Sequence, residues 1–184
     1  GHNEVSLVIR VVGLKEGLML VLFTSISPLA LYSKKIKSAS EIKDGATIAI
    51  PNDPSNGGRA LQLLAKQGWI ELKPDVPATK VTKADITKYV KKIKIVEIEA
   101  PQLPRSLDDT TASVINAGYA FAANLTKKDQ IVAEDNTSPY VNIIAVKKGR
   151  ETDPSIVKYI EIFHTEPVKK FIEDKYKGQV IPAW

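Results

Sequence analysis

A short apolar run is followed at once by a turn-forming segment and then by a helical pattern, and this order constrains the fold more than any other feature of the chain. Residues 46–50 read ATIAI, residues 51–58 read PNDPSNGG, and apolar residues at helical spacing run from Arg59 to Gly68. A continuous apolar strand of this kind is typical of a parallel sheet that is buried on both faces. Strand, glycine-rich turn and helix make half of a β–α–β unit, so the sequence predicts an α/β fold.

The remaining periodic segments fit the same class. Alternating or continuous apolar patterns predict strands at residues 4–12, 18–24, 93–100, 112–116 and 140–146, the first two joined as a hairpin through 13–17. Capping and helical spacing predict a short helix or turn at 38–45, helices at 83–92 and 102–111, and two C-terminal helices that begin at Asp153-Pro154 and at Thr165. The apolar run within 18–24 is far too short to cross a bilayer and is interpreted as a buried strand.

Composition excludes several classes of function. The chain has no cysteine and two histidines, which excludes thiolate sites and cysteine nucleophiles and gives no metal-ligand spacing. Asp108 and Asp109 are neighbours that do not face each other on a helix, and Ser106 has no base at a recognisable motif spacing. The net charge is +5, but the lysines are interleaved with acids, which favours solvated helix faces over a nucleic-acid surface. The sequence therefore predicts no enzyme, no metal, no cofactor and no nucleic-acid partner.

Three polar residues remain as candidates for ligand binding. Arg59 comes just after a strand end and its glycines, where a guanidinium can hold a carboxylate through two parallel hydrogen bonds; a surface arginine at a helix start is an equal alternative. Asn116 ends one apolar strand and Asn142 lies inside another. A buried amide without a partner costs about 1–3 kcal/mol, so each asparagine either bonds the backbone or is presented to a small polar ligand.

Several consecutive motifs resemble one known family. They are SPLALYSKKIKS (27–38), DGATIAIPNDPSNGGRAL (44–61), QLPRSLDDTTASVIN (102–116), SPYVNIIAVKKG (138–149) and VKKFIEDKYKGQVIPAW (168–184). In this order they resemble the NlpA lipoproteins, the methionine-binding substrate-binding proteins of bacterial ABC importers. The resemblance covers about residues 22–184.

The resemblance implies a fold, a site and partners. The expected fold is α/β and periplasmic-binding-protein-like (type II), with two lobes of which one is truncated: residues 1–46 and 141–184 as the remnant of lobe I, and 47–140 as lobe II. Arg59 is expected to hold the ligand carboxylate, and Asn56, Asn116 and Asn142 to complete a site for L-methionine or a similar amino acid. The implied partners are an ABC permease and its ATPase. The implied location is the extracytoplasmic face of the cell membrane, through a lipid anchor outside this chain.

One departure from the family pattern matters for function. Family members carry an N-terminal segment, similar to D-x-N-x-F-Q-H-x-x-Y-L, whose aromatic and histidine side chains enclose the methionine side chain, and this sequence has no such segment. We therefore expect the chain alone to bind methionine weakly. We also expect uncovered strand edges and helix faces to favour a homodimer or a domain-swapped arrangement, with residues 5–24 as a candidate swapped segment. The alternatives are a binder of another amino acid or a short methionine peptide, and a regulatory or interaction module that kept the fold without transport.

Overall fold

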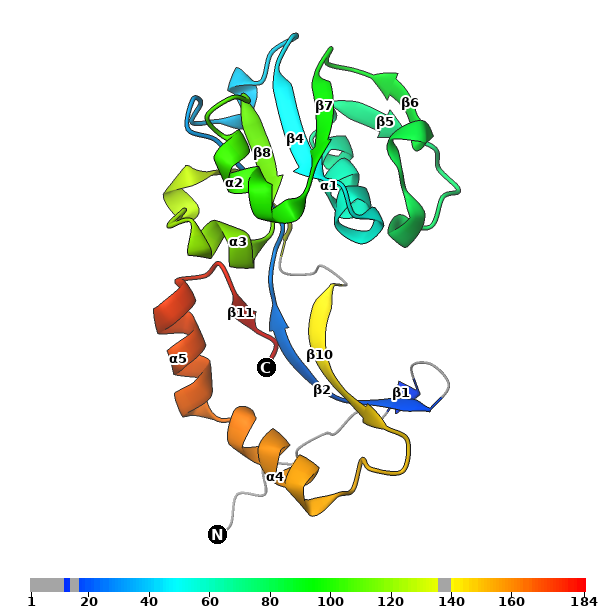
Figure 1. Cartoon of the computed structure of the whole chain (residues 1–184), viewed down its shortest axis with the longest axis vertical. Helices are drawn as coiled ribbons and strands as arrows, with labels where there is room; N and C mark the ends of the chain where they lie inside the picture. The colour runs from blue at the N-terminus through cyan, green and yellow to red at the C-terminus, as the bar shows by residue number, and fades with distance from the viewer. Residues whose placement is uncertain (1–11, 14–16, 136–139) are drawn as a thin grey trace. The chain divides into compact units, whose positions relative to one another are not determined.

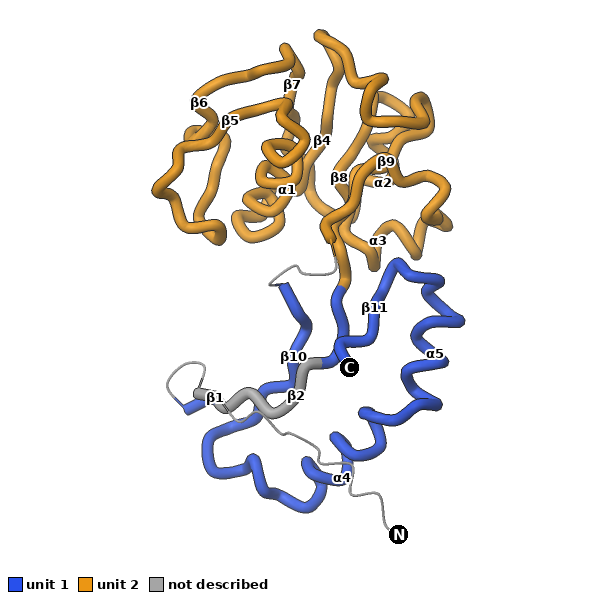
Figure 2. Tube along the Cα trace, turned by 180° about the vertical axis from the view of Figure 1, so that it is seen from behind, with its two compact units in different colours: residues 1–26, 139–184 blue, residues 27–138 orange. Residues whose placement is uncertain are grey.

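The computed structural model describes residues 12–13, 17–135 and 140–184, with the backbone alone at 12–13 and 19–23. The chain divides into two compact units (Figure 2). Unit 1 comprises residues 1–26 and 139–184, and unit 2 comprises residues 27–138.

A five-stranded sheet organises unit 2. Its strand order is β7-β4-β8-β3-β9. The strands are β3 (Ala30–Tyr32), β4 (Thr47–Pro51), β7 (Lys94–Ile98), β8 (Ala112–Ile115) and β9 (Gln130–Ala133). Strand β4 lies between β7 and β8 and runs parallel to both, whereas β3 runs antiparallel to β8 and β9. The prediction of a buried parallel strand at ATIAI is confirmed.

Helices cover both faces of this sheet (Figure 1). Alternate residues of β4 point to opposite faces, so Ile48 and Ile50 join one core cluster while Ala49 joins the other. Helix α1 (Pro54–Lys66) fills the first cluster with Ala60, Leu61, Leu63 and Leu64. Helices α2 (Leu103–Ser106) and α3 (Ala117–Ala122) fill the second. The strand sequence therefore fixes which side of β4 each helix covers.

Helix α1 begins earlier than the sequence predicts. Its N-cap is Asp53, whose carboxylate accepts a hydrogen bond from the Asn56 N–H at 2.9 Å, and Pro54 is its first residue. The two glycines that were interpreted as a turn are therefore helical. A Cβ on Gly57 would lie 2.9 Å from the Pro51 carbonyl oxygen, so this glycine is required by close helix–strand packing. Arg59 lies in the second turn of the helix and not at its start.

A second prediction was wrong at residues 83–92. The Thr82–Asp85 capping box forms, but it opens a single 3₁₀ turn, Lys83–Asp85, that leads into strand β6 (Ile86–Tyr89). Strand β6 pairs antiparallel with β5 (Ile70–Leu72). Tertiary pairing of the β-branched Ile86 and Thr87 overrides the local helix signal. Similar 3₁₀ turns lie at Ala39–Glu41, Ala78–Lys80, Ala100–Gln102 and Lys127–Asp129.

Unit 1 is built on an antiparallel sheet. Its elements are β1 (Val12–Gly13), β2 (Leu18–Ile26), β10 (Val141–Lys147), β11 (Ile181–Pro182), α4 (Pro154–Phe163) and α5 (Glu166–Tyr176). Strand β2 pairs with β1, β10 and β11, which confirms the predicted pairing of the two N-terminal strands; most of the predicted strand 4–12 lies outside the described residues. Among the described side chains of this unit, the buried apolar ones are Val146, Ile160 and Ile172. No helix in the described part of the chain is both long and apolar enough to span a membrane.

The boundary between the units differs from the predicted one. The sequence prediction placed residues 1–46 with 141–184, whereas residues 27–46 belong to unit 2. The physical reason is strand pairing, because β3 lies between β8 and β9 in the sheet of unit 2, with Leu31 opposite Val114 and Val132. A three-residue strand carries no sequence signal for which sheet it joins.

Candidate functional site

The carboxyl ends of β4 and β8 lie at the same edge of the sheet in unit 2, since these strands are parallel. Helix α1 and Arg59 follow the end of β4, and Asn116 follows the end of β8 as the N-cap residue of α3. In open α/β sheets, ligands bind outside the carboxyl ends of the strands. This edge therefore brings together three of the four predicted site residues, Arg59, Asn56 and Asn116.

Arg59 is held by a network of short contacts inside unit 2. Its Nε donates to Glu134 Oε1 at 3.0 Å, and its Nη2 donates to Glu134 Oε2 at 2.5 Å. The Nη1 atom donates to Asn56 Oδ1 at 3.2 Å, and Nη2 also donates to the Ser27 carbonyl oxygen at 3.3 Å. The side chains of Arg59 and Glu134 are only 11% and 13% exposed. The guanidinium is therefore a largely buried, fixed group and not a mobile surface cation.

The contacts of Arg59 affect the prediction that its guanidinium binds a ligand carboxylate. The two parallel hydrogen bonds expected for a ligand are made to Glu134. Breaking a buried pair by removing one partner costs about 3–5 kcal/mol, because the other charge is left buried and unpaired. One hydrogen bond to a charged group contributes about 1.5–3 kcal/mol. The two bonds gained by a ligand carboxylate that displaced Glu134 would therefore be offset by the cost of leaving Glu134 buried and unpaired.

Asn116 presents an unusual polar atom. Its side chain makes no capping bond to α3, and its buried Oδ1 has no hydrogen-bond partner among the residues that the structure describes. The alternative in which this amide oxygen accepts a backbone hydrogen bond is therefore not found among the described residues of unit 2. A buried carbonyl oxygen without a donor costs about 1–3 kcal/mol, so this atom is suited to accept a hydrogen from a bound polar group.

Asn142, the fourth predicted residue, lies in unit 1 on β10. Its side-chain Nδ2 donates to Ser25 Oγ at 3.3 Å, and its backbone oxygen accepts a hydrogen bond from Thr24 Oγ1 at 3.1 Å. The pairing of β10 with β2 shifts register between Asn142 and Ile143. Such a bulge redirects a side chain out of the regular ladder, and Asn142 is exposed.

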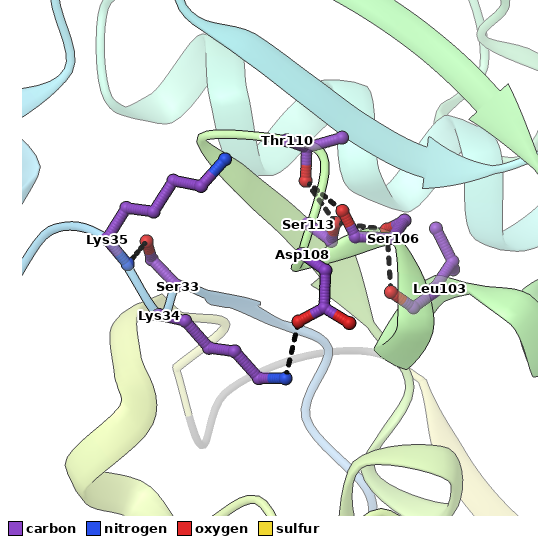
Figure 3. A network of polar contacts seen from close by, with 8 residues as sticks. All are labelled: Ser33, Lys34, Lys35, Leu103, Ser106, Asp108, Thr110 and Ser113. Carbon is purple, nitrogen blue, oxygen red and sulfur yellow. Dashed lines mark hydrogen bonds and ion pairs between the residues drawn. The ribbon is translucent and has the colours of Figure 1, made fainter.

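Ser106 and Asp108, also considered in the sequence, have structural partners in a polar network that includes Ser113 of β8 (Figure 3). The Ser106 and Ser113 hydroxyls lie 2.6 Å apart, and Asp108 forms an ion pair with Lys34 at 2.9 Å. The hydrogen bond from Lys34 lowers the pKa of Asp108. No group of three histidine, aspartate or glutamate side chains that could hold a metal lies among the described residues. This hydroxyl network ties the start of β8 to neighbouring segments and does not form a nucleophile with a base.

Glu134 is the site residue that sequence reasoning missed. It directly follows β9, a strand of four residues that was not predicted, so no signal placed Glu134 at the edge occupied by Arg59. Its N–H donates to the Leu29 carbonyl oxygen at 2.9 Å, and its Oε2 accepts from the Leu29 N–H at 2.9 Å. An acid immediately after an apolar QIVA run is the feature that could have indicated it.

The sequence is similar to those of known proteins. The family model described as NlpA lipoprotein matches residues 13–184. The chain belongs to the NlpA lipoprotein family. Among NlpA relatives, outer membrane lipoprotein 3 of Mannheimia haemolytica is 46% identical over 162 residues, and the D-methionine-binding lipoprotein MetQ of Escherichia coli K12 is 43% identical over 164 residues. These matches cover 88% of this chain but 61% and 60% of the relatives, so the chain spans about three fifths of their length.

Solved structures of the NlpA type confirm the fold class. A nutrient binding protein from Burkholderia cenocepacia bound to methionine superposes with a TM-score of 0.84 at 43% identity, covering 91% of this chain and 71% of that one. An ABC transporter periplasmic substrate-binding protein from Coxiella burnetii gives 0.82 at 38% identity, covering 91% and 70%. The predicted α/β periplasmic-binding-protein-like fold is confirmed, and a little under a third of each neighbour has no counterpart here.

Proposed function

We propose that this chain is the amino-acid-binding part of an ABC-transporter solute-binding protein, with L-methionine or a related amino acid as its ligand. The observation that carries the proposal is the placement of two polar groups at one sheet edge of unit 2: the fixed guanidinium of Arg59, and the buried Oδ1 of Asn116, which has no partner among the described residues. A cationic donor and a neutral acceptor at one edge suit the carboxylate and ammonium groups of an α-amino acid.

The relatives support the ligand class. The Escherichia coli relative is named as a D-methionine-binding lipoprotein, and the Burkholderia cenocepacia neighbour was solved with methionine. The Arg59–Glu134 pair is neutral overall. A neutral pair favours a zwitterion over a simple anion, because an anion would bring an uncompensated charge to a largely buried edge. In this proposal the chain performs no catalysis, and a ligand-binding role of Asn142 stays a separate prediction for unit 1.

The expected affinity is low. Methionine has about nine non-hydrogen atoms, so tight binding requires nearly complete enclosure even at the ceiling of about 1.5 kcal/mol per atom. The family segment that encloses the methionine side chain has no counterpart in this sequence. One charge-assisted bond and neighbouring amide bonds hold the polar end of the ligand and leave its thioether in water.

Isothermal titration with L-methionine, together with ¹H–¹⁵N NMR for weak binding, tests the proposal. We expect saturable binding at high ligand concentration, with resonance shifts at Arg59 and Asn116, and loss of binding in Asn116→Leu. Lys66→Ala is the matched control, since Lys66 lies two turns after Arg59 on α1 and pairs with Asp135 in an exposed ion pair. Absence of any shift in the wild-type chain at saturating methionine contradicts the proposed ligand. Submicromolar affinity of the monomer contradicts the expected weakness.

The partners and location follow from the same proposal. We infer delivery of the amino acid to an ABC permease with its ATPase, at the extracytoplasmic face of a membrane, through a lipid anchor outside this chain. The support is the family itself, whose members here are named as lipoproteins, and the Coxiella burnetii neighbour, which is named as part of an ABC transporter.

We also propose that the chain forms a homodimer through unit 1. Tyr159, Ile162 and Phe171 of this unit are 55%, 58% and 58% exposed, while its buried apolar side chains are few among those described. A second copy would cover this apolar surface, and apolar surface removed from water contributes about 25 cal/mol per Å². The candidate swapped segment, residues 5–24, falls partly outside the described residues.

A further inference from the structure

The Arg59–Glu134 pair lies close to both ends of unit 2: Arg59 bonds Ser27, and Glu134 lies near Ser138 in sequence. The chain enters unit 2 at Ser27 and leaves it at Ser138. Arg59 Nη2 donates to the Ser27 carbonyl oxygen, and the Nε and Nη2 atoms donate to Glu134. Through one side chain, helix α1 therefore holds the first residue of unit 2 and a residue close to its last.

Both the backbone and the side chain of Glu134 are hydrogen-bonded to Leu29. Its N–H donates to the Leu29 carbonyl oxygen, and the Leu29 N–H donates back to Glu134 Oε2, each at 2.9 Å. These bonds extend the pairing of β3 with β9 beyond the last ladder residues, Ala30 and Ala133. The carboxylate thus stands on a rigid sheet edge and can impose its own position on the guanidinium.

Two roles for Glu134 are physically distinct. In the first, the ligand carboxylate displaces Glu134 and takes over both of its hydrogen bonds to Arg59. In the second, Glu134 stays in place and fixes the guanidinium plane, so that the ligand meets a guanidinium edge already oriented by Asn56. Displacement leaves the Glu134 carboxylate unpaired at 13% side-chain exposure and also breaks its bond from the Leu29 N–H, so the two bonds that the ligand takes over replace only two of the three that Glu134 loses. The energetic comparison favours the second role.

We propose that Glu134 is a positioning residue for the ligand site: it orients Arg59 for the ligand carboxylate. This inference rests on the proposed amino-acid-binding function. Its physical content is pre-organisation, since a side chain held in its bound geometry before the ligand arrives loses less conformational freedom on binding.

The first test needs no ligand. The Arg59 Nε–H should give a separate NMR resonance with slowed solvent exchange in the wild-type chain, and this resonance should collapse into the exchanging arginine envelope in Glu134→Gln. An amide keeps one acceptor oxygen but turns a donor toward the other guanidinium nitrogen. Asp135→Asn is the matched control, because it removes the same charge at the next residue from an exposed pair with Lys66. An Arg59 resonance that is equally protected in Glu134→Gln overturns the proposal.

The second test compares L-methionine with methioninol, which lacks the carboxylate. For positioning, Glu134→Gln weakens methionine binding about tenfold and leaves methioninol binding unchanged, so the ratio of the two affinities falls about tenfold. Tighter methionine binding in Glu134→Gln shows displacement and overturns the proposal, and equal losses for both ligands show a purely structural role and also overturn it. Glu134→Asp keeps the charge but shortens the side chain, so the ratio of methionine affinity to methioninol affinity should fall less than in Glu134→Gln. If the wild-type chain binds neither ligand, the proposed function fails, and the Arg59 resonance still decides whether Glu134 orients the guanidinium.

Discussion

Gly57 of helix α1 lies against the carbonyl oxygen of Pro51, the last residue of β4, so closely that a Cβ atom on it would stand 2.9 Å from that oxygen. A Cβ on the next residue, Gly58, would stand 3.0 Å from the Val81 carbonyl oxygen. Both obstacles are backbone atoms and not flexible side-chain ends. The paired glycines therefore set how near α1 approaches the sheet edge, and with it the position of Arg59 one residue later.

Replacement of Gly57 by alanine should destabilise the chain although alanine is the better helix former. The propensity gain is about 1 kcal/mol, whereas forcing a methyl group into a packed contact costs about 1–3 kcal/mol. We expect a net loss of up to about 2 kcal/mol in the free energy of unfolding, measured by urea denaturation followed by circular dichroism. Gly118→Ala is the control, because Gly118 is helical in α3 and a Cβ there would meet nothing within 4 Å. A Gly57→Ala variant as stable as Gly118→Ala contradicts the packing argument.

The buried ion pair should show strong coupling in a double-mutant cycle. Arg59→Met and Glu134→Leu should each lower the free energy of unfolding by about 3–5 kcal/mol, because each leaves its partner charged and largely buried. The double variant should recover most of that loss, since two apolar side chains replace the pair. Lys66→Met, which breaks an ion pair whose side chains are 63% and 52% exposed, should change stability by about 0–1 kcal/mol. Additive losses in the double variant would show that the pair is not coupled.

Asp153 should give unit 1 a pH-dependent stability at low pH. The hydrogen bond from Arg150, followed by those from the Ser155 hydroxyl and N–H, lowers the pKa of Asp153 from 3.8 to about 2. Because the folded pKa is below the unfolded one, the ionised carboxylate stabilises the fold above the unfolded value of 3.8, and this contribution is lost as the pH falls through about 2.

Asp153→Asn removes this titration and keeps a side-chain oxygen at the N-cap of α4. The melting temperatures of the wild type and the variant should converge as the pH falls from 3.8 towards 2, while other carboxylates affect both chains alike. NMR titration of the Asp153 carboxyl carbon measures the pKa directly. A difference in melting temperature that stays constant across this range would contradict the assignment.

The proposed homodimer predicts a mass that depends on concentration. Light scattering coupled to size exclusion should give a mass above the 20.2 kDa of one chain, and Ile162→Lys with Phe171→Lys should shift it towards one chain. Val90→Lys is the control, because Val90 is 48% exposed but belongs to unit 2. A mass of one chain at every concentration, in the wild type, would exclude this dimer.

The strands and helices that could be predicted from the sequence are those that bury one face. The ATIAI strand, the strand that holds Asn142 and the helix with Ile156, Ile160 and Phe163 on one stripe were predicted because burial imposes a period on the sequence. The motifs also indicated the family. The roles assigned to Arg59, Asn56, Asn116 and Asn142 in ligand binding stay predictions.

Two kinds of error have a common cause. Residues 83–92 carry a true capping box, yet the strand pairing of Ile86–Tyr89 with β5 lies far outside the local window that a helix signal uses. The start of α1 was placed too late because Gly57 and Gly58 read as turn residues, and only the nearness of the Pro51 and Val81 oxygens explains glycines inside a helix. In both cases a tertiary contact outweighs a local propensity.

The sequence by itself determined the alternation of buried strands and helices, the family and the presence of an arginine after the ATIAI strand, because these depend on residue type and spacing along the chain. Only the tertiary structure decided which partner Arg59 has. Glu134 is 75 positions away and reaches the guanidinium because β9 joins the sheet three positions from β4, and Glu134, one residue beyond β9, lies at the same edge. Sequence spacing carries no information on such a contact, since the geometry of a sheet, and not distance along the chain, brings the two charges together.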